Sequence, residues 1–348
     1  MEFGLFTLFD FFRDQQDEVQ YYRDTLELMV LAEQLGFDSV WGGEEHFYSF
    51  GLCPSPQLFL TAVARETSRI RVGTAISLLP FENPLRKAED FAMLDILSNG
   101  RLNFGVGRGI IPKHFEGFRV DPRESRARYE ESLAIIRGAW TQDDFSYEGQ
   151  FWQVPPLSLS PKPMQKPHPP IYRGTLSLDS FETAAVIGDN AFIVPWLTGE
   201  HAEVRARVQR YRTLLKEHGH GQKRTTCIFF LFVDPDHQVA VRDGRESTYN
   251  YTRLFTSFIP PEALKKLRPD DPFKAFLDFA LSMPDHLEER AIVGTPAECR
   301  RRLKELHDEF DLDQVAFYFH AGARDPKRAR YGMELFANEV MPEFKTSH

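Results

Sequence analysis

The sequence predicts an α/β fold of the (β/α)8 class, a TIM barrel. The hydrophobic period switches repeatedly between 2 and 3.6 along the 348 residues, as in chains whose strands alternate with helices. The first four strand-like runs begin near residues 3, 38, 70 and 101, and spacings of about 31 to 35 residues suit a repeated βα unit with parallel strands. A total of about eight such strands favours a closed barrel over a doubly wound sheet.

Strands are predicted where apolar, β-branched or aromatic residues run together. In chain order they cover 3–9, 38–42, 70–79, 101–106, 170–175, 191–195, 225–233 and 314–320. Because the active sites of such barrels lie at the carboxyl ends of the strands, the residues just after each strand are the candidates for function.

Helices are predicted between the strands, where apolar residues recur with the helical period. The first helix ends at Gly36, a typical C′ glycine, and Asn83-Pro84 and Thr295-Pro296 are typical helix starts. The predicted helices cover about 17–35, 56–67, 84–100, 122–140, 200–218, 239–258, 296 onward and 325–344.

Two insertions interrupt the pattern within what we expect to be a single domain over 1–348. Seven prolines from Pro155 to Pro170 argue against a central strand or helix there. We therefore predict a short hairpin and an extended surface connection over 145–170. The segment 259–290 carries Pro-Pro, Asp-Asp-Pro and many charges, and it is predicted to be an excursion from the barrel.

Charge and cysteine content narrow the partners and the compartment. The chain has 42 Lys and Arg against 51 Asp and Glu, a net charge of −9, with both signs mixed. This balance disfavours nucleic acid and anionic membranes as main partners. No stretch approaches the ~20 apolar residues that span a bilayer, and the N-terminus lacks the features of a signal peptide. The three cysteines are far apart and form no CxxC, so we expect a reduced, cytoplasmic compartment.

Three ionisable residues, Glu44, Glu45 and His46, follow the strand at 38–42. Adjacent residues at a strand end point in opposite directions, so the two carboxylates are poorly placed to flank one bond as a glycosidase pair does. No HxH or HExxH spacing is present at this strand end, and no metal site is predicted. Two interpretations stay open: these residues cap the next element, or at least one of them works as an acid or base.

The next two strand ends carry small residues and glycines. Thr74, Ala75 and the adjoining Ile76 would let a flat ring approach the backbone. Three glycines surround Arg108 in the run GVGRG at 105–109, which is not a Rossmann fingerprint because the third glycine falls one place early. Arg108 either meets a phosphate with its guanidinium or is a surface residue in an ordinary tight turn.

Two later strand ends offer an anion site and an aromatic side chain. After 170–175, Ser177 and Ser180 gather hydroxyls and backbone N–H groups at a helix N-terminus, which suits an anion. Ordinary helix capping explains the same residues, and both roles can be served at once. Trp196 follows the strand at 191–195 and is either a stacking surface or a core residue.

Several fragments resemble the bacterial luciferase-like flavin monooxygenases, in the same order and over nearly the whole chain. The fragments are EEHF at 44–47, VGTA at 72–75, NPLRKAED at 83–90, DILSNGR at 95–101, GVGRG at 105–109, SRAR at 125–128 and VGTP at 293–296. The resemblance implies a (β/α)8 barrel, usually a homodimer. It also implies binding of reduced FMN, supplied by a separate flavin reductase, and its reaction with O2 to a C4a-peroxyflavin.

The resemblance further implies roles for single residues. Arg108, Ser177 and Ser180 resemble the contacts to the flavin phosphate. Ala75-Ile76 corresponds to the place where the family often has a non-prolyl cis peptide beneath the isoalloxazine. His46 matches a family histidine near the flavin.

Four residues depart from the luciferases proper. Glu45 stands where they have a histidine acting as catalytic base, and His114 stands where they have an acidic residue. If these two side chains face each other, acid and base have exchanged places. Gly107 replaces a loop cysteine, and Leu176 replaces the acidic residue before the phosphate-site serine. These departures argue against light emission with a long-chain aldehyde.

The implied function is an FMNH2- and O2-dependent two-component monooxygenase acting on a small-to-medium apolar organic substrate. Glu45, His46 and His114 are the expected acid-base residues. With 31 Phe in the chain, an apolar pocket is expected; the candidates at strand ends are Phe9, Phe47, Phe81 and Trp196.

Other outcomes remain open. The segment 259–290 matches a region that is mobile in relatives, and we expect it to act as a lid. An F420-dependent hydride-transfer oxidoreductase, which would not need O2, is one alternative. A flavin-binding homologue without catalysis is another.

Overall fold

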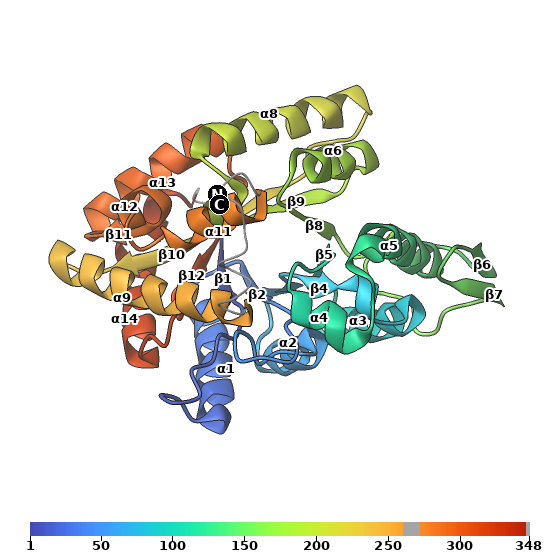
Figure 1. Cartoon of the computed structure of the whole chain (residues 1–348), viewed down its shortest axis with the longest axis horizontal. Helices are drawn as coiled ribbons and strands as arrows, with labels where there is room; N and C mark the ends of the chain where they lie inside the picture. The colour runs from blue at the N-terminus through green and yellow to red at the C-terminus, as the bar shows by residue number, and fades with distance from the viewer. Residues whose placement is uncertain (260–271, 346–348) are drawn as a thin grey trace.

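The computed structural model describes residues 1–259 and 272–345. Within these residues, eight parallel strands form a closed barrel surrounded by helices, which confirms the predicted fold class (Figure 1). The barrel strands are β1 (Glu2–Thr7), β2 (Ser39–Gly42), β3 (Arg71–Thr74), β5 (Leu102–Gly107), β8 (Ile171–Thr175), β9 (Asn190–Ile193), β10 (Thr225–Val233) and β12 (Gln314–Tyr318). Each corresponds to one of the eight predicted strands.

The barrel closes through β1, which pairs with β2 on one side and with β12 on the other. Leu5 lies opposite Val40 of β2 and opposite Phe317 of β12. On the far side, β10 joins β12 to β9. All these pairings are parallel, so the carboxyl ends of the strands meet at one mouth.

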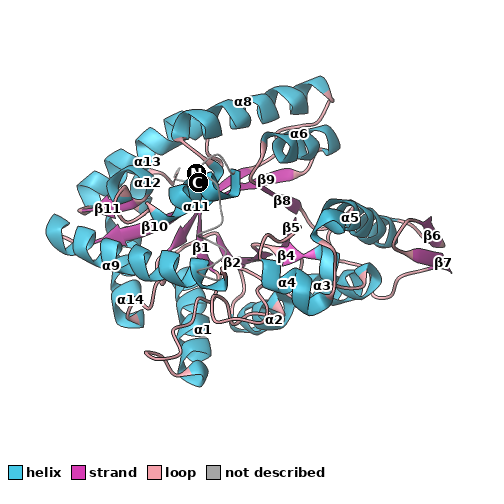
Figure 2. Ribbon diagram, viewed as in Figure 1, coloured by secondary structure: helices cyan, strands magenta, loops and turns pink. Residues whose placement is uncertain are grey.

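Helices cover the outside of the barrel (Figure 2). The longer ones are α1 (Glu18–Gln34), α2 (Pro56–Glu66), α3 (Pro84–Leu97), α5 (Ser125–Thr141), α6 (Leu178–Ile187), α8 (His201–Glu217), α9 (His237–Phe255), α11 (Pro272–Leu281), α13 (Pro296–Phe310) and α14 (Pro326–Glu339). Shorter elements are β4 (Ser77–Leu78), η1 (Leu79–Phe81), α4 (Pro112–Phe118), η2 (Pro122–Glu124), α7 (Pro195–Thr198), η3 (Thr256–Phe258), α12 (Leu287–Arg290), β11 (Ile292–Gly294) and η4 (Met341–Glu343).

Local signals in the sequence explain several helix ends. The Asn83 side chain accepts the backbone N–H of Leu85 at the start of α3. Thr295 and Glu298 form a capping box at the start of α13. Gly36, just after α1, has a φ of 84°, a backbone conformation that glycine adopts without steric cost.

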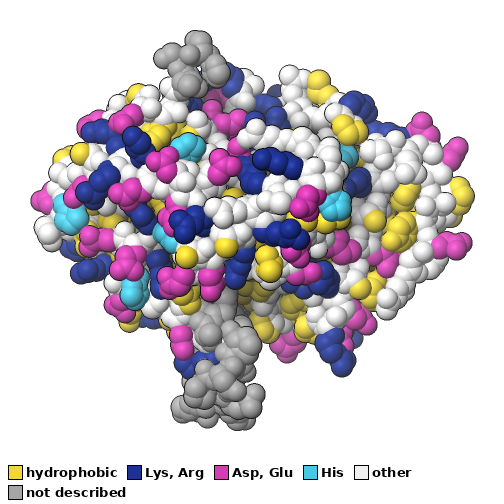
Figure 3. Space-filling model, turned by 90° about the horizontal axis from the view of Figure 1, so that it is seen from above, with side chains coloured by type: hydrophobic (Ala, Val, Ile, Leu, Met, Phe, Trp, Pro, Cys, Tyr) yellow, Lys and Arg dark blue, Asp and Glu magenta, His cyan; other side chains and the backbone are white. Residues whose placement is uncertain are grey.

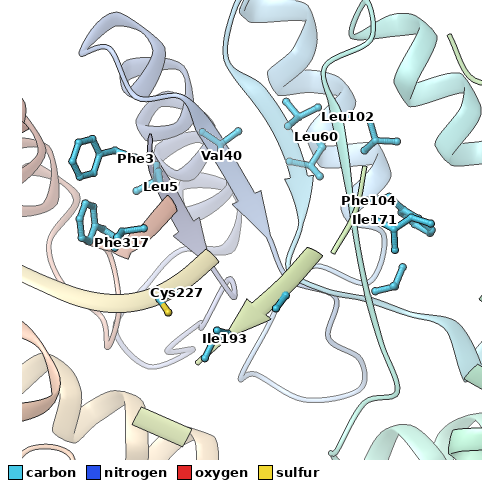
Figure 4. Packing of buried hydrophobic residues seen from close by; sticks show 14 of the residues in the cluster. Phe3, Leu5, Val40, Leu60, Leu102, Phe104, Ile171, Ile193, Cys227 and Phe317 are labelled. Atoms are coloured by element: carbon cyan, nitrogen blue, oxygen red, sulfur yellow. The ribbon is translucent and has the colours of Figure 1, made fainter. Parts of the chain in front are cut away.

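Apolar side chains fill the space both outside and inside the strands. Val40, Phe104 and Phe317 point outward and pack beneath the helices, each with 0% exposure (Figure 4). Inside the barrel, Trp41 packs edge-on against Tyr172, with ring centroids 5.0 Å apart. Such packing fills the barrel interior as in other TIM barrels and leaves the mouth as the place for a site.

The structure corrects three details of the prediction. The segment 70–79 is not one strand, because a non-prolyl cis peptide at Ala75-Ile76, the one that the resemblance implied, separates β3 from β4. β11 was missed; its three residues are too few to show a period. The excursion predicted over 259–290 contains two helices, α11 and α12, that the sequence analysis did not predict. Residues 260–271, which belong to that excursion and to the expected lid, lie outside the described residues.

The other insertion and the surface agree with the prediction. β6 (Phe145–Glu148) and β7 (Gln153–Leu157) form the expected antiparallel hairpin. On the face in Figure 3, basic and acidic side chains are interspersed rather than gathered by sign. Among the described residues, no helix combines the length and the apolar character needed to cross a membrane.

Candidate active site

A cavity of about 240 Å³ opens at the mouth of the barrel. Its lining comes from the carboxyl ends of β1, β2, β3, β5, β8 and β9, together with β10, α4, α5, α6, α7 and α9. The side formed by β5, β8, α5 and α6 is polar and includes Arg108, Arg126, Ser177 and Ser180. The side formed by β9, β10 and α9 is apolar and aromatic. One cavity therefore offers an anion-binding end and an apolar end.

Glu44 and Glu45 both line the cavity but have different partners. Glu44 is 3% exposed and accepts hydrogen bonds from Lys87 Nζ at 2.8 Å and from Ser77 Oγ at 2.8 Å. Its other oxygen lies 3.1 Å from His46 Nε2. The Glu44–Lys87 ion pair is buried, because Lys87 is only 1% exposed, and it fixes the carboxylate that holds the His46 ring.

Because of this ion pair, the free energy of unfolding depends on pH in the acid range. Burial alone would raise the pKa of Glu44, but Lys87 and His46 outweigh it and lower the pKa to about 2, below the ordinary 4.5. Glu44 therefore stabilises the folded protein above about pH 4.5, and this contribution is lost as the pH falls from there towards about 2.

We expect Glu44→Gln to flatten this dependence, because the amide does not titrate. The free energy of unfolding, measured by urea denaturation from about pH 5 to about pH 3, should fall less for this variant than for the parent protein. Glu66→Gln, at an exposed position, serves as the control. Equal slopes for Glu44→Gln and the parent would contradict the assignment.

Glu45 contacts His114, the pair that the departures from the luciferases singled out. Glu45 Oε2 lies 3.1 Å from His114 Nε2, and His114 is 1% exposed. The backbone N–H of His46 lies 3.1 Å from the same nitrogen. His114 Nε2 accepts this backbone N–H, and Glu45 Oε2 has no hydrogen-bond donor among the described residues. The Glu45–His114 contact is therefore a close approach of two ionisable groups without a hydrogen bond between them.

His46 itself lies beside the cavity rather than in its lining. Its ring packs edge-on against Phe118, with centroids 4.8 Å apart. It lines a neighbouring, more polar pocket of about 690 Å³, which Glu45 also lines. Glu45 thus stands between the two spaces, while His46 faces the outer one.

The anion-binding end combines arginines with a helix N-terminus. Ser177 and Ser180 form a capping box at the start of α6, and the Ser180 hydroxyl accepts the backbone N–H of Ser177 at 3.0 Å. Ordinary capping is therefore present, and the positive end of the helix still faces the cavity. Arg126 contacts Asp179 Oδ2 at 2.7 Å, while Arg108 is exposed.

The residues that contact Ile76 at the floor of the cavity are small. A Cβ at Gly107 would lie 1.9 Å from Ile76 Cδ1, and one at Gly174 would lie 3.1 Å from it. The Ile76 side chain thus occupies the space that a cysteine at 107 would need. Ala75 and Ile76 both line the cavity, and Thr74 is buried beneath, donating its hydroxyl to Gly105 O at 2.6 Å.

Of the four predicted aromatic pocket residues, Trp196 lines the cavity. The other three do not: Phe9 is 0% exposed and packs edge-on against Phe59 in the core, Phe47 is 58% exposed, and Phe81 stacks on Phe118. A place just after a strand does not fix which way a side chain points. The aromatic residues of the lining that the sequence analysis missed are Phe6, Phe50, Tyr129, Phe192, Tyr251 and Phe255.

Comparisons with known proteins agree with this arrangement. The model of a family described as luciferase-like monooxygenase matches residues 1–311. The oxygenase component of a flavin-dependent trigonelline monooxygenase from Acinetobacter baylyi is 28% identical, over 100% of this chain and 96% of its own length. The crystal structure of monooxygenase RslO1 from Streptomyces bottropensis superposes with a TM-score of 0.88 and 27% identity, covering 99% of this chain and 100% of that one.

A third protein shows the shared fold at lower identity. The oxygenating constituent of 3,6-diketocamphane monooxygenase from the CAM plasmid of Pseudomonas putida, in complex with FMN, has a TM-score of 0.80 and 21% identity. The match covers 99% of this chain and 98% of that one.

Proposed function

This chain belongs to the luciferase-like monooxygenase family, and from that membership we propose that it is an FMNH2- and O2-dependent monooxygenase, the oxygenase component of a two-component system. The proposed substrate is a small-to-medium, largely apolar organic compound. The observation that carries the proposal is one cavity at the barrel mouth that joins an anion-binding end to the Glu45–His114 contact.

The residues of the cavity fit reduced FMN. Arg108, Arg126 and the N-terminus of α6 would bind its phosphate, because guanidinium groups and the positive end of a helix both favour an anion. Ala75 and Ile76 would contact the flat ring system. When bound, reduced FMN supplies the activation of O2.

The chain's own residues control protons and water. Glu45 and His114 would exchange a proton with the reacting groups. The buried Glu44–Lys87 pair orients His46, whose backbone N–H donates to His114 Nε2. The apolar part of the lining keeps water away from the reaction.

A separate flavin reductase would supply the reduced FMN, and the naming of the Acinetobacter relative as an oxygenase component supports this. We also propose that the chain forms a homodimer through α3. Met93, Ile96 and Leu97 share one face of this helix and are 47%, 45% and 43% exposed. Exposed apolar residues gathered in this way are typical of an interface.

The dimer is tested by Leu97→Glu, which puts a charge into this face. We expect the parent chain to have the mass of a dimer by light scattering, and the variant to shift towards the mass of a monomer. Gln209→Glu, which adds the same charge at an exposed position of α8, is the control and should keep the parent mass. A parent protein that is monomeric at micromolar concentration would contradict the proposal.

Flavin binding is tested by anaerobic titration with reduced FMN and, in parallel, with reduced F420. We expect Arg108→Ala to weaken the affinity for reduced FMN by about 10- to 100-fold, since hydrogen bonds to a charged group contribute about 1.5–3 kcal/mol. Arg65→Ala, an exposed arginine away from the cavity, should bind as the parent does.

The same titration separates the proposal from its alternatives. A clear preference for reduced F420 would favour hydride transfer without O2. If Arg108→Ala binds reduced FMN as tightly as the parent protein, the assignment of the phosphate to the anion-binding end is contradicted.

A further inference from the structure

Two buried hydrogen-bond donors in the cavity have no protein partner. Trp196 Nε1 and Tyr251 OH each belong to a residue that lines the cavity, and the two residues are 2% and 1% exposed. Among residues 1–259 and 272–345, no group accepts a hydrogen bond from either atom. An unpaired buried donor costs about 1–3 kcal/mol, so donors of this kind are normally satisfied by a ligand or by water.

The two donors lie together at the apolar end. The rings of Trp196 and Tyr251 meet edge-on, with centroids 5.4 Å apart. Phe50 packs against Tyr251 at 5.3 Å and against Phe255 at 5.2 Å, so the four rings form a continuous aromatic surface. A ligand here would meet apolar rings on its body, and its polar group could pair with donors that two neighbouring residues carry.

Along the sheet, Tyr251 is distant from Arg108, whereas Trp196 follows a strand that pairs with β8. Trp196 follows β9, and Tyr251 lies on α9, which packs against β10. Arg108 follows β5, and β8 and β9 intervene between β5 and β10 in the sheet. Tyr251 is therefore set apart from Arg108, and the two donors, at the aromatic end of the cavity, suit the second molecule in the cavity, the substrate.

The electrostatic surroundings favour a neutral acceptor. Burial raises the pKa of Tyr251 well above its usual range, and the carboxyl groups of Asp10 and Glu45 raise it further. The Glu45 carboxylate would repel an anionic acceptor such as a carboxylate, whereas burial raises the pKa of Asp10 to about 7 and leaves that group only partly charged at neutral pH. A carbonyl oxygen accepts two hydrogen bonds without carrying a net charge.

We propose that Trp196 Nε1 and Tyr251 OH recognise the carbonyl oxygen of a neutral, largely apolar substrate held on the aromatic surface of Phe50, Trp196, Tyr251 and Phe255. The proposal rests on the proposed function only in calling this ligand the substrate. The two donors set specificity, because a site built to pair them discriminates against an analogue that lacks the acceptor.

The test compares 1-indanone with 1-methyleneindane, in which a CH2 group replaces the carbonyl oxygen. Binding is followed with 15N-labelled protein through the indole N–H resonances of the four tryptophans, with and without oxidised FMN. The Trp196 resonance is assigned from Trp196→Phe.

We expect 1-indanone to shift the Trp196 indole resonance and to bind more tightly than 1-methyleneindane by about 3- to 10-fold for each of the two donors, the factor given by a neutral hydrogen bond of about 0.5–1.5 kcal/mol. Tyr251→Phe should weaken the binding of 1-indanone by the factor expected for one donor and leave the affinity for 1-methyleneindane unchanged. Tyr21→Phe is the matched control, because Tyr21 is buried, its hydroxyl also lacks a partner among the described residues, and it does not line the cavity.

Three results would overturn the proposal. Equal affinities of the two compounds would mean that water satisfies the donors. Weaker binding of oxidised FMN in Tyr251→Phe, with 1-indanone unchanged, would assign the donors to the cofactor. If 1-indanone binds neither in the presence nor in the absence of FMN, the proposed binding site is contradicted. None of these results depends on oxygenation, so they are distinguishable from failure of the proposed function, which is tested by reduced FMN and Arg108→Ala.

Discussion

Replacement of Glu45 by Gln is expected to lower the rate of substrate oxygenation by about 10²-fold or more, the usual contribution of a positioned acid or base. Gln keeps the size and a polar contact to His114 Nε2, which lies 3.1 Å from the carboxylate, but it does not exchange a proton. Affinity for reduced FMN should stay within about twofold, because Glu45 lies away from the anion-binding end.

The measurement is the rate of oxygenated product formation at saturating reduced FMN, on the member of a ketone panel that the parent protein oxidises. Glu116→Gln, an exposed position on the same short helix as His114, is the control and should retain the parent rate. A Glu45→Gln variant with the parent rate and the parent pH profile would remove Glu45 from the chemistry.

Replacement of Lys87 by Met should cost about 3–5 kcal/mol of unfolding free energy, the range for removing one partner of a buried ion pair. Lys87 and Glu44 are 1% and 3% exposed, so the variant leaves a buried carboxylate without its cation. The His46 ring, held by the other oxygen of Glu44, would lose its fixed orientation.

Urea denaturation at neutral pH measures this effect. Lys216→Met, an exposed lysine on α8, should change the free energy of unfolding by less than about 0.5 kcal/mol. The double variant Glu44→Gln/Lys87→Met should be more stable than Lys87→Met alone, because the unpaired charge is gone. A Lys87→Met variant as stable as the parent would show that the pair does not hold this part of the barrel.

The barrel could be predicted from the sequence because its signals are local and repeated. Each βα unit carries its own change of period, and the helix ends at Gly36 and Asn83 follow from single residues and their neighbours. β11 was not predicted because a three-residue strand shows no period. α11 was not predicted because the prolines and charges around 259–290 indicated an excursion from the barrel.

Local patterns predicted the candidate site only where it comes from strand ends, whereas His114 on α4 was indicated by the resemblance. Glu45, Arg108 and Ser177 directly follow strands, and the parallel barrel brings such positions to one mouth. Lys87 and Tyr251 lie on helices and reach the site through packing that no short pattern records. A signal for Lys87 does exist: it is four residues before Phe91 on the buried face of α3, where a lysine needs a partner.

The direction in which a side chain points could also not be predicted from the sequence. Phe9 has a φ of 60° and is buried in the core, so its place after β1 did not bring it to the cavity. Glu44, in contrast, was seen in the sequence but gained its role only through Lys87 and Ser77, which lie 43 and 33 residues further along the chain.

The central claim is that this chain transfers oxygen from O2 with reduced FMN. Its most direct test supplies reduced FMN from a flavin reductase, under 18O2, to the protein and the ketone panel, and measures the isotope in the product by mass spectrometry. We predict one 18O atom per product molecule, with formation that requires FMN and is lost in Glu45→Gln. A product that forms without O2 from reduced F420, or one that carries oxygen only from water, would contradict the claim.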